Sequence, residues 1–238
     1  LISVIEHESV LAPAKLFKHR QIPVSSQGIV DTAGLEKMIS DKTVLVSVGL
    51  VNNEIGTIQP LSDISTILNK SSKLRGSKGL PLYLHTDAAQ APNYLDLHVS
   101  RLCVDLLTIN GGKIYGPKQS GALYIRAGIK LKPLILGGGQ ENGLRSGTEN
   151  VAGAIGLAVA FNLAQKKRNS ENRRLTELRK LFLDTIGKNI TGAIVNGSSK
   201  HCAPHIVSVT LPGADNERLM MELDEHGVAV ATGSACSA

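Results

Sequence analysis

Short apolar runs recur along the first part of the chain, separated by polar or helix-like stretches. Most of their positions are apolar instead of alternating with polar residues, which is typical of strands buried on both faces of a parallel sheet. We expect strands over Leu1–Ile5, Val44–Leu50, Leu82–His85, Val104–Ile109 and Gly121–Ile125. Leu61–Leu68 has the spacing of an amphipathic helix, with Ser62 as its predicted N-cap. The alternation predicts an α/β fold with a mainly parallel sheet.

The pattern changes after about Asn150. The expected elements are, in order, a helix Val151–Gln165, a helix Leu175–Ile186, a strand Ile206–Leu211, a helix Glu217–His226 and a strand Val228–Ala231. Gly227 has the place of a glycine that ends a helix. We therefore predict two domains, a large one over residues 1–167 and a smaller α/β one over residues 168–238. Between the elements of the large domain, Ser71–Gly79 is predicted to be an exposed loop.

Composition narrows the class of protein. Hydrophobic residues make up 42% and charged residues 19% of the 238 residues, which is typical of a globular protein with a real core. The net charge is +6, but the basic residues are scattered and only 3% of residues are aromatic, so no stacking platform for nucleic acid is expected. Three cysteines without CxxC spacing favour a reducing, cytoplasmic compartment over a disulfide framework. No apolar run has the length of a membrane span, and we expect no membrane partner.

Candidate chemistry gathers at the predicted strand ends. Lys113 follows a strand and two glycines, which let the backbone approach a phosphate. The surrounding sequence does not fit a Walker A motif, because Ile114 stands where Ser or Thr would bind magnesium. Asp87 follows another strand, where it could serve a ligand or cap a helix. Cys236, flanked by small residues, is either an accessible thiol or a small buried apolar residue.

Taken one at a time, each of these clusters also has a structural interpretation as a turn, a cap or a solvated side chain. Together they favour a single ligand site, because a parallel sheet gathers the ends of its strands on one edge. They supply a lysine, a carboxylate, an asparagine, a glutamine and an imidazole. A lysine for a Schiff base and an acidic partner for a ring nitrogen are the groups that hold pyridoxal 5′-phosphate.

Six motifs in order resemble the cysteine desulfurases of the class V aminotransferase fold, of the iron–sulfur-assembly type. They are EH (Glu6-His7), NNEIGTIQP (Asn52–Pro60), HTDAAQ (His85–Gln90), GKIYGPK (Gly112–Lys118), GGGQENGLRSGTEN (Gly137–Asn150) and ATGSACS (Ala231–Ser237). The resemblance implies the pyridoxal-phosphate-dependent transferase fold of type I, with a large domain and part of a small one. It also implies removal of sulfur from L-cysteine, giving L-alanine and a persulfide.

The resemblance assigns roles to individual residues. Lys113 matches the lysine that binds the cofactor and Asp87 the carboxylate on its ring nitrogen. Gln90 and Asn53 match side chains near the phenolic oxygen, and His7 matches the imidazole that stacks on the ring. The remaining matches are Asn110 and Thr148 for the phosphate, Thr148 from the neighbouring subunit of a homodimer, and Cys236 for the persulfide. No metal site is implied beyond an iron–sulfur contact through Cys236.

Two positions depart from the family pattern. The family usually has Ser-x-His-Lys where this chain has Asn110-Gly111-Gly112-Lys113, and Glu-Arg-Gly where it has Glu141-Asn142-Gly143. The family chain is longer at both ends, so the sequence is expected to be a fragment. The expected partner is a sulfur acceptor or an iron–sulfur scaffold protein. A selenocysteine lyase and a non-catalytic scaffold member of the family remain as alternatives.

Overall fold

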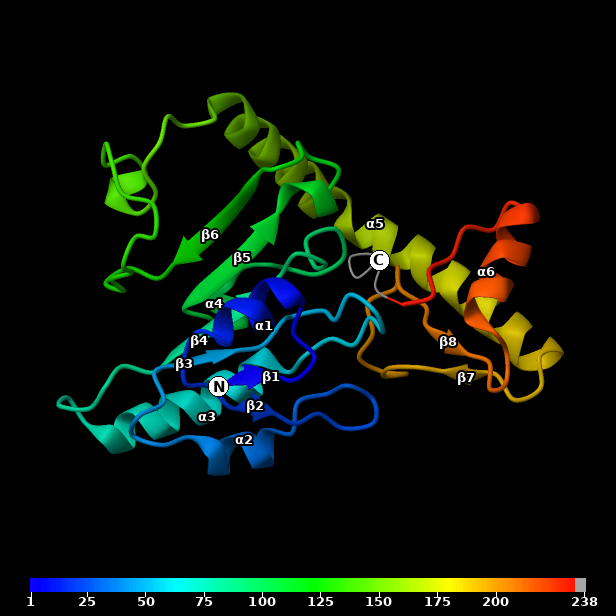
Figure 1. Ribbon diagram of the computed structural model, residues 1–238, viewed down its shortest axis with the longest axis horizontal. Helices are drawn as coiled ribbons and strands as arrows, with labels where there is room; N and C mark the ends of the chain where they lie inside the picture. The colour runs from blue at the N-terminus through cyan, green and yellow to red at the C-terminus, as the bar shows by residue number, and fades with distance from the viewer. Residues whose placement is uncertain (234–238) are drawn as a thin grey trace.

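The computed structural model describes residues 1–233, and its main feature is a six-stranded sheet in the order β2-β1-β3-β4-β5-β6 (Figure 1). The strands are β1 (Ile2–Ser3), β2 (Gln21–Ile22), β3 (Leu45–Ser47), β4 (Tyr83–Asp87), β5 (Leu106–Asn110) and β6 (Gly121–Ile125). Neighbouring strands from β2 to β5 pair in parallel, and β6 pairs antiparallel with β5. The predicted α/β fold with a mainly parallel sheet is confirmed.

Four helices accompany these strands in the first part of the chain: α1 (Glu8–Ala14), α2 (Thr32–Met38), α3 (Leu61–Arg75) and α4 (Val99–Leu102). Two predictions for α3 were wrong. Its N-cap is Pro60, which makes no side-chain capping bond, instead of Ser62. The helix also continues to Arg75, so the predicted loop over Ser71–Gly79 is in its first half the last turn of α3.

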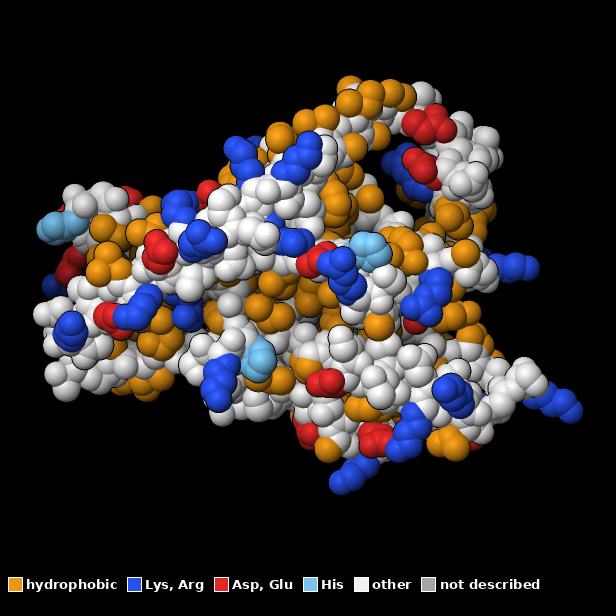
Figure 2. Space-filling model, turned by 180° about the vertical axis from the view of Figure 1, so that it is seen from behind, with side chains coloured by type: hydrophobic (Ala, Val, Ile, Leu, Met, Phe, Trp, Pro, Cys, Tyr) orange, Lys and Arg blue, Asp and Glu red, His pale blue; other side chains and the backbone are white. Residues whose placement is uncertain are grey.

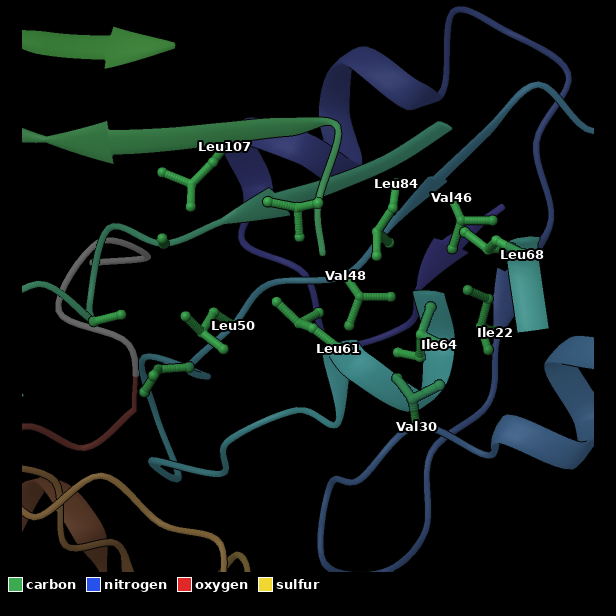
Figure 3. Packing of buried hydrophobic residues seen from close by; sticks show 14 of the residues in the cluster. Ile22, Val30, Val46, Val48, Leu50, Leu61, Ile64, Leu68, Leu84 and Leu107 are labelled. Carbon is green, nitrogen blue, oxygen red and sulfur yellow. The ribbon is translucent and has the colours of Figure 1, made fainter. Parts of the chain in front are cut away.

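The hydrophobic core lies between α3 and one face of the sheet. Leu61, Ile64 and Leu68 point from α3 toward side chains of the strands, as Figure 3 shows. Burial alternates along β4, where Leu84 and Thr86 are fully buried while His85 and Asp87 on the other face are only half-buried. On β4, therefore, one face is fully buried and the other only partly, which differs from the burial on both faces that the apolar pattern suggested. The less buried face of β4 carries the polar side chains of His85 and Asp87.

One helix, α5 (Val151–Asn189), spans 39 residues, and the two helices predicted within it are continuous. Figure 1 shows it running from the region beside β5 and β6 to a second group of elements. That group contains β7 (Ile194–Val195), β8 (Val209–Thr210) and α6 (Asn216–Glu225). The predicted boundary between residues 167 and 168 falls inside α5, and the division into two domains stays a prediction.

The end of α6 settles two further expectations. Gly227 has a φ of +75° and its amide bonds to the carbonyl of Asp224, so it ends the helix as predicted. The strand predicted over Val228–Ala231 is wrong. The amide of Val228 is turned back onto the carbonyl of Leu223, and those residues pair with no strand among the described residues. Within residues 1–233, no helix is both long and apolar enough to cross a membrane.

Candidate active site

A cavity of about 370 Å³ opens at the carboxyl ends of β1, β3, β4 and β5. Small-molecule sites in proteins have volumes of roughly 300–1,000 Å³. Parallel strands end at a common edge, which is why segments far apart in the sequence meet here. The polar residues on its wall are Ser3, Glu6, His7, Ser9, Asn52, Asn53, Asp87, Gln90, Asn110 and Lys113. The structure therefore brings together six of the seven expected site residues that it describes.

Lys113 ends a short 3-10 helix, Gly111–Lys113, directly after β5. The Asn110 side chain caps this turn, with its Oδ1 accepting from the amide of Gly112 at 2.8 Å. The carbonyl of Lys113 accepts from Asn93 Nδ2 at 3.1 Å, and this bond fixes the backbone. The exposed Lys113 side chain lines the cavity. Asn110 thus has a local structural role in addition to its place on the wall.

Asp87 is the last residue of β4, and its Oδ1 accepts from the amide of Ala89 at 2.8 Å. This bond closes a turn. No helix follows, so the helix-capping alternative does not apply. Gln90 lies in the same turn and also lines the cavity. The turn accordingly presents a carboxylate and an amide to one ligand.

Glu6 is a second carboxyl group on the wall, which the sequence analysis did not single out as a site residue. It is buried, with 7% of its surface exposed. Burial and the nearby Asp87 charge raise the pKa of Glu6 to about 7, against the opposing hydrogen bonds from the Gly49 amide and Ser47. A carboxyl group after the first strand, next to the predicted His7, was the only sequence signal for it.

A chain of hydrogen-bonding side chains runs beneath the cavity on the polar face of the sheet. Ser47 Oγ donates to Glu6 Oε1 at 3.3 Å and lies 2.8 Å from His85 Nδ1. His85 Nε2 lies 3.0 Å from Thr108 Oγ1. Desolvation lowers the pKa of His85, which outweighs the opposing effect of Asp87 and favours the neutral imidazole. The chain therefore links Glu6 to side chains on β3, β4 and β5.

His7 has a structural function of its own. It is the N-cap of α1, and its Nδ1 accepts from the amide of Ser9 at 3.1 Å while lying 2.8 Å from Ser9 Oγ. It also lines the cavity. A role in stacking on a cofactor ring stays a prediction.

The loop that carries Asn53 is braced by a distant segment of the chain. Asn52 Oδ1 caps the loop by accepting from the amides of Glu54 and Ile55, and Asn52 Nδ2 donates to the carbonyl of Ile5 at 3.1 Å. Residues 201–203 then bond to this loop, with the amide of Ala203 donating to the carbonyl of Gly56 at 2.8 Å. The second group of elements thus supports one wall of the cavity.

One of the expected site residues that the structure describes does not lie on the wall. Thr148 is exposed and does not line the cavity, which leaves its predicted action on a neighbouring subunit untested. Cys236 lies outside the described residues. Among residues 1–233, no group of three or more His, Cys, Asp or Glu side chains is arranged to hold a metal ion.

The aminotransferase class-V family model matches residues 1–238. The chain is 41% identical over 242 aligned positions to the cysteine desulfurase IscS of Dictyoglomus turgidum and covers 59% of that protein's length. It is also 41% identical to the cysteine desulfurase IscS 1 of Archaeoglobus fulgidus, of which it covers 60%. In both alignments the whole of this chain is matched, so it spans about three fifths of the length of these curated relatives.

Solved structures agree with the family assignment. A NifS-like protein superposes with a TM-score of 0.89 at 35% identity, covering 97% of this chain and 62% of that one. The apo cysteine desulfurase of Thermococcus onnurineus superposes with a TM-score of 0.83 at 26% identity, covering 99% and 62%. The strand-end cavity, the lysine after β5 and the family match over the full length agree, and the chain belongs to the class-V aminotransferase family.

Proposed function

We propose that the protein from which this chain derives is a pyridoxal-phosphate-dependent cysteine desulfurase. The observation that carries the proposal is that Lys113 and Asp87 line one cavity together with Asn53, Gln90 and His7. The class-V aminotransferases and their cysteine desulfurase members depend on pyridoxal phosphate. A lysine, a carboxylate and flanking amides are the side chains that this cofactor requires.

The donor set fits the cofactor group by group. Lys113 Nζ would hold its carbonyl carbon, and Asp87 would pair with its protonated ring nitrogen. The amides of Asn53 and Gln90 offer donors for the phenolic oxygen, and Asn110 is placed near the phosphate in this proposal. Bound pyridoxal phosphate supplies an electron sink for negative charge that develops at Cα of an amino acid.

The chain's own residues then move a proton and a sulfur atom. Lys113 Nζ takes and returns the proton at Cα of the substrate L-cysteine, as a general base and acid. The Cys236 thiolate attacks the substrate sulfur, since the thiolate is the nucleophilic form. A sulfur–sulfur bond forms while the substrate Cβ–S bond breaks. The electron pair of the broken bond goes to the substrate Cβ, which takes up a proton. L-Alanine is then released, and the persulfide stays on Cys236.

Partners and location belong to the same proposal. The persulfide would pass to a sulfur acceptor or an iron–sulfur scaffold protein in the cytoplasm. A homodimer is supported by apolar side chains that Figure 2 shows along the arch at the top of the molecule. Exposed large apolar residues between positions 134 and 159 include Leu134, Ile135, Leu136, Val151, Ile155 and Val159. Apolar patches of this kind often mark protein interfaces.

The test uses the complete gene product loaded with pyridoxal phosphate. Lys113→Ala should lose the visible absorbance of bound cofactor, while Lys118→Ala, at an exposed lysine that does not line the cavity, should keep it. Cys236→Ala should keep the absorbance and lose sulfide release from cysteine. Sulfide release retained by Cys236→Ala would contradict the nucleophile assignment. A wild-type protein that shows no absorbance change with the cofactor would favour the non-catalytic scaffold.

A further inference from the structure

Two carboxyl groups face the cavity, and the proposed function uses only one of them. Asp87 ends β4, whereas Glu6 follows β1 and reaches the same wall from another strand. Gly49 lies next to the Glu6 carboxyl group and the Asp87 backbone. A Cβ atom there would stand 3.2 Å from Glu6 Oε2 and 3.8 Å from the backbone oxygen of Asp87. The missing side chain at position 49 leaves room for the Glu6 carboxyl group beside Asp87.

Hydrogen bonds hold the carboxyl group of Glu6 in place. It accepts hydrogen bonds from Ser47 Oγ and from the backbone amide of Gly49. Ser47 is 2% exposed and is held in turn by His85. A buried carboxyl group with two donors and a bonded support is preorganised, since it cannot swing into solvent without leaving these donors unpaired. The arrangement therefore holds a second acidic group against the ligand side of the cavity.

We propose that Glu6 is a positioning residue that forms a carboxyl pair with Asp87 and thereby sets the charge offered to the cationic ring nitrogen of a pyridine ligand. The inference rests on the proposed function, because that function supplies the ligand. Asp87 makes the contact with the ring nitrogen, and Glu6 acts through Asp87. The other titratable groups around the pair are His85, which bonds to Ser47, and His7 and Lys113, which line the same cavity.

A cation bound next to the carboxyl pair should favour loss of the proton from Glu6. Two carboxylates close together in a partly buried site repel each other, so the pKa of Glu6 is raised to about 7 and Glu6 is still partly protonated near neutral pH. A cationic ring bound at Asp87 offsets this repulsion and favours release of that proton. By linkage, the affinity for such a ring rises as the pH increases through the Glu6 titration. A bound cation that lowers the pKa of Glu6 by ~1 unit gives roughly fivefold tighter binding at about pH 8 than at about pH 6.

The test measures binding of pyridoxamine 5′-phosphate, which keeps the pyridine ring and cannot condense with a lysine. Its dissociation constant is determined between about pH 6 and pH 8 for the complete gene product and for two variants. Glu6→Gln removes the titrating group while keeping its size. Glu54→Gln is the matched control, because Glu54 is exposed and does not line the cavity. Comparison between variants cancels the titration of the ligand itself.

We expect the affinity of the wild type and of Glu54→Gln for pyridoxamine 5′-phosphate to follow the same pH dependence. Between about pH 6 and pH 8, the rise in affinity should be about fivefold smaller for Glu6→Gln. Identical profiles for all three proteins would overturn the carboxyl pair and leave the proposed function standing. Failure of the wild type to bind pyridoxamine phosphate or pyridoxal phosphate at any pH would overturn both. A purely structural role for Glu6 would weaken binding by the same factor at every pH, which also contradicts the inference.

Discussion

Replacing His205 by Phe should make the protein more resistant to mild acid. His205 stacks on Tyr94, with ring centroids 4.0 Å apart and an interplanar angle of 18°. Both of its ring nitrogens are buried, and neither has a hydrogen-bond partner among residues 1–233. Desolvation of this imidazole lowers its pKa from 6.5 to about 4. A phenyl ring keeps the stacking surface and has no proton to bind.

The size of the effect follows from linkage. A histidine whose pKa is depressed in the folded state contributes stability that is complete above its unfolded pKa of 6.5 and is lost as the pH falls toward 4. At about pH 5 the unfolded chain has bound the proton and the folded chain has not. The wild type should therefore lose roughly 2 kcal/mol of unfolding free energy through this residue between about pH 7.5 and pH 5.

The assay is urea unfolding of the complete gene product at about pH 7.5 and pH 5. His205→Phe should lose ~2 kcal/mol less than the wild type between these two conditions. His201→Phe is the control, since His201 is exposed, and it should behave as the wild type does. The difference between variants removes the contribution of other groups, including Glu6, whose raised pKa makes stability fall as the pH rises from 4.5 to about 7. Equal acid sensitivity of His205→Phe and the wild type would refute the reasoning.

Two further changes test the cavity and the core. Gly112→His introduces the imidazole that the family usually has at this position, and among residues 1–233 a Cβ atom there comes within 4 Å of Asn110 Oδ1 alone, at 3.3 Å. The added imidazole should tighten binding of pyridoxal phosphate by about tenfold through a charge-assisted hydrogen bond. Equilibrium dialysis with Gly112→Ala as control would detect this, and equal affinities would contradict it. Ile64→Ala should cost about 2–5 kcal/mol of unfolding free energy, because Ile64 is fully buried under the sheet, whereas Thr66→Ala on the exposed face of α3 should cost far less.

The sequence by itself determined the fold class and most of the cavity wall. Apolar runs separated by helical spacing imply parallel strands, and parallel strands bring their ends to one edge. That local rule was sufficient to place Asp87 and Lys113 together, although more than twenty residues separate them in the sequence. The motifs around them then identified the family, which full-length similarity confirmed.

Other features were decided only by the tertiary structure. Two apolar patterns with a charged stretch between them look like two helices, but propensity alone cannot show a break, and α5 is continuous. The run at residues 228–231 has strand-like residues, yet no neighbouring strand pairs with it among the described residues. The amide of Val228 instead donates to the carbonyl of Leu223 at the end of α6. A strand exists only where a partner accepts its hydrogen bonds.

The role inferred for Glu6 depends on the same kind of information. In sequence it is one of many acidic residues, and its neighbour His7 draws more attention. Only the packing shows that Gly49 leaves room for its carboxyl group and that Ser47 fixes it beside Asp87. Residue type and spacing determined which groups reach the sheet edge. The burial and the nearby charge that raise the pKa of Glu6 arise only when distant strands lie side by side.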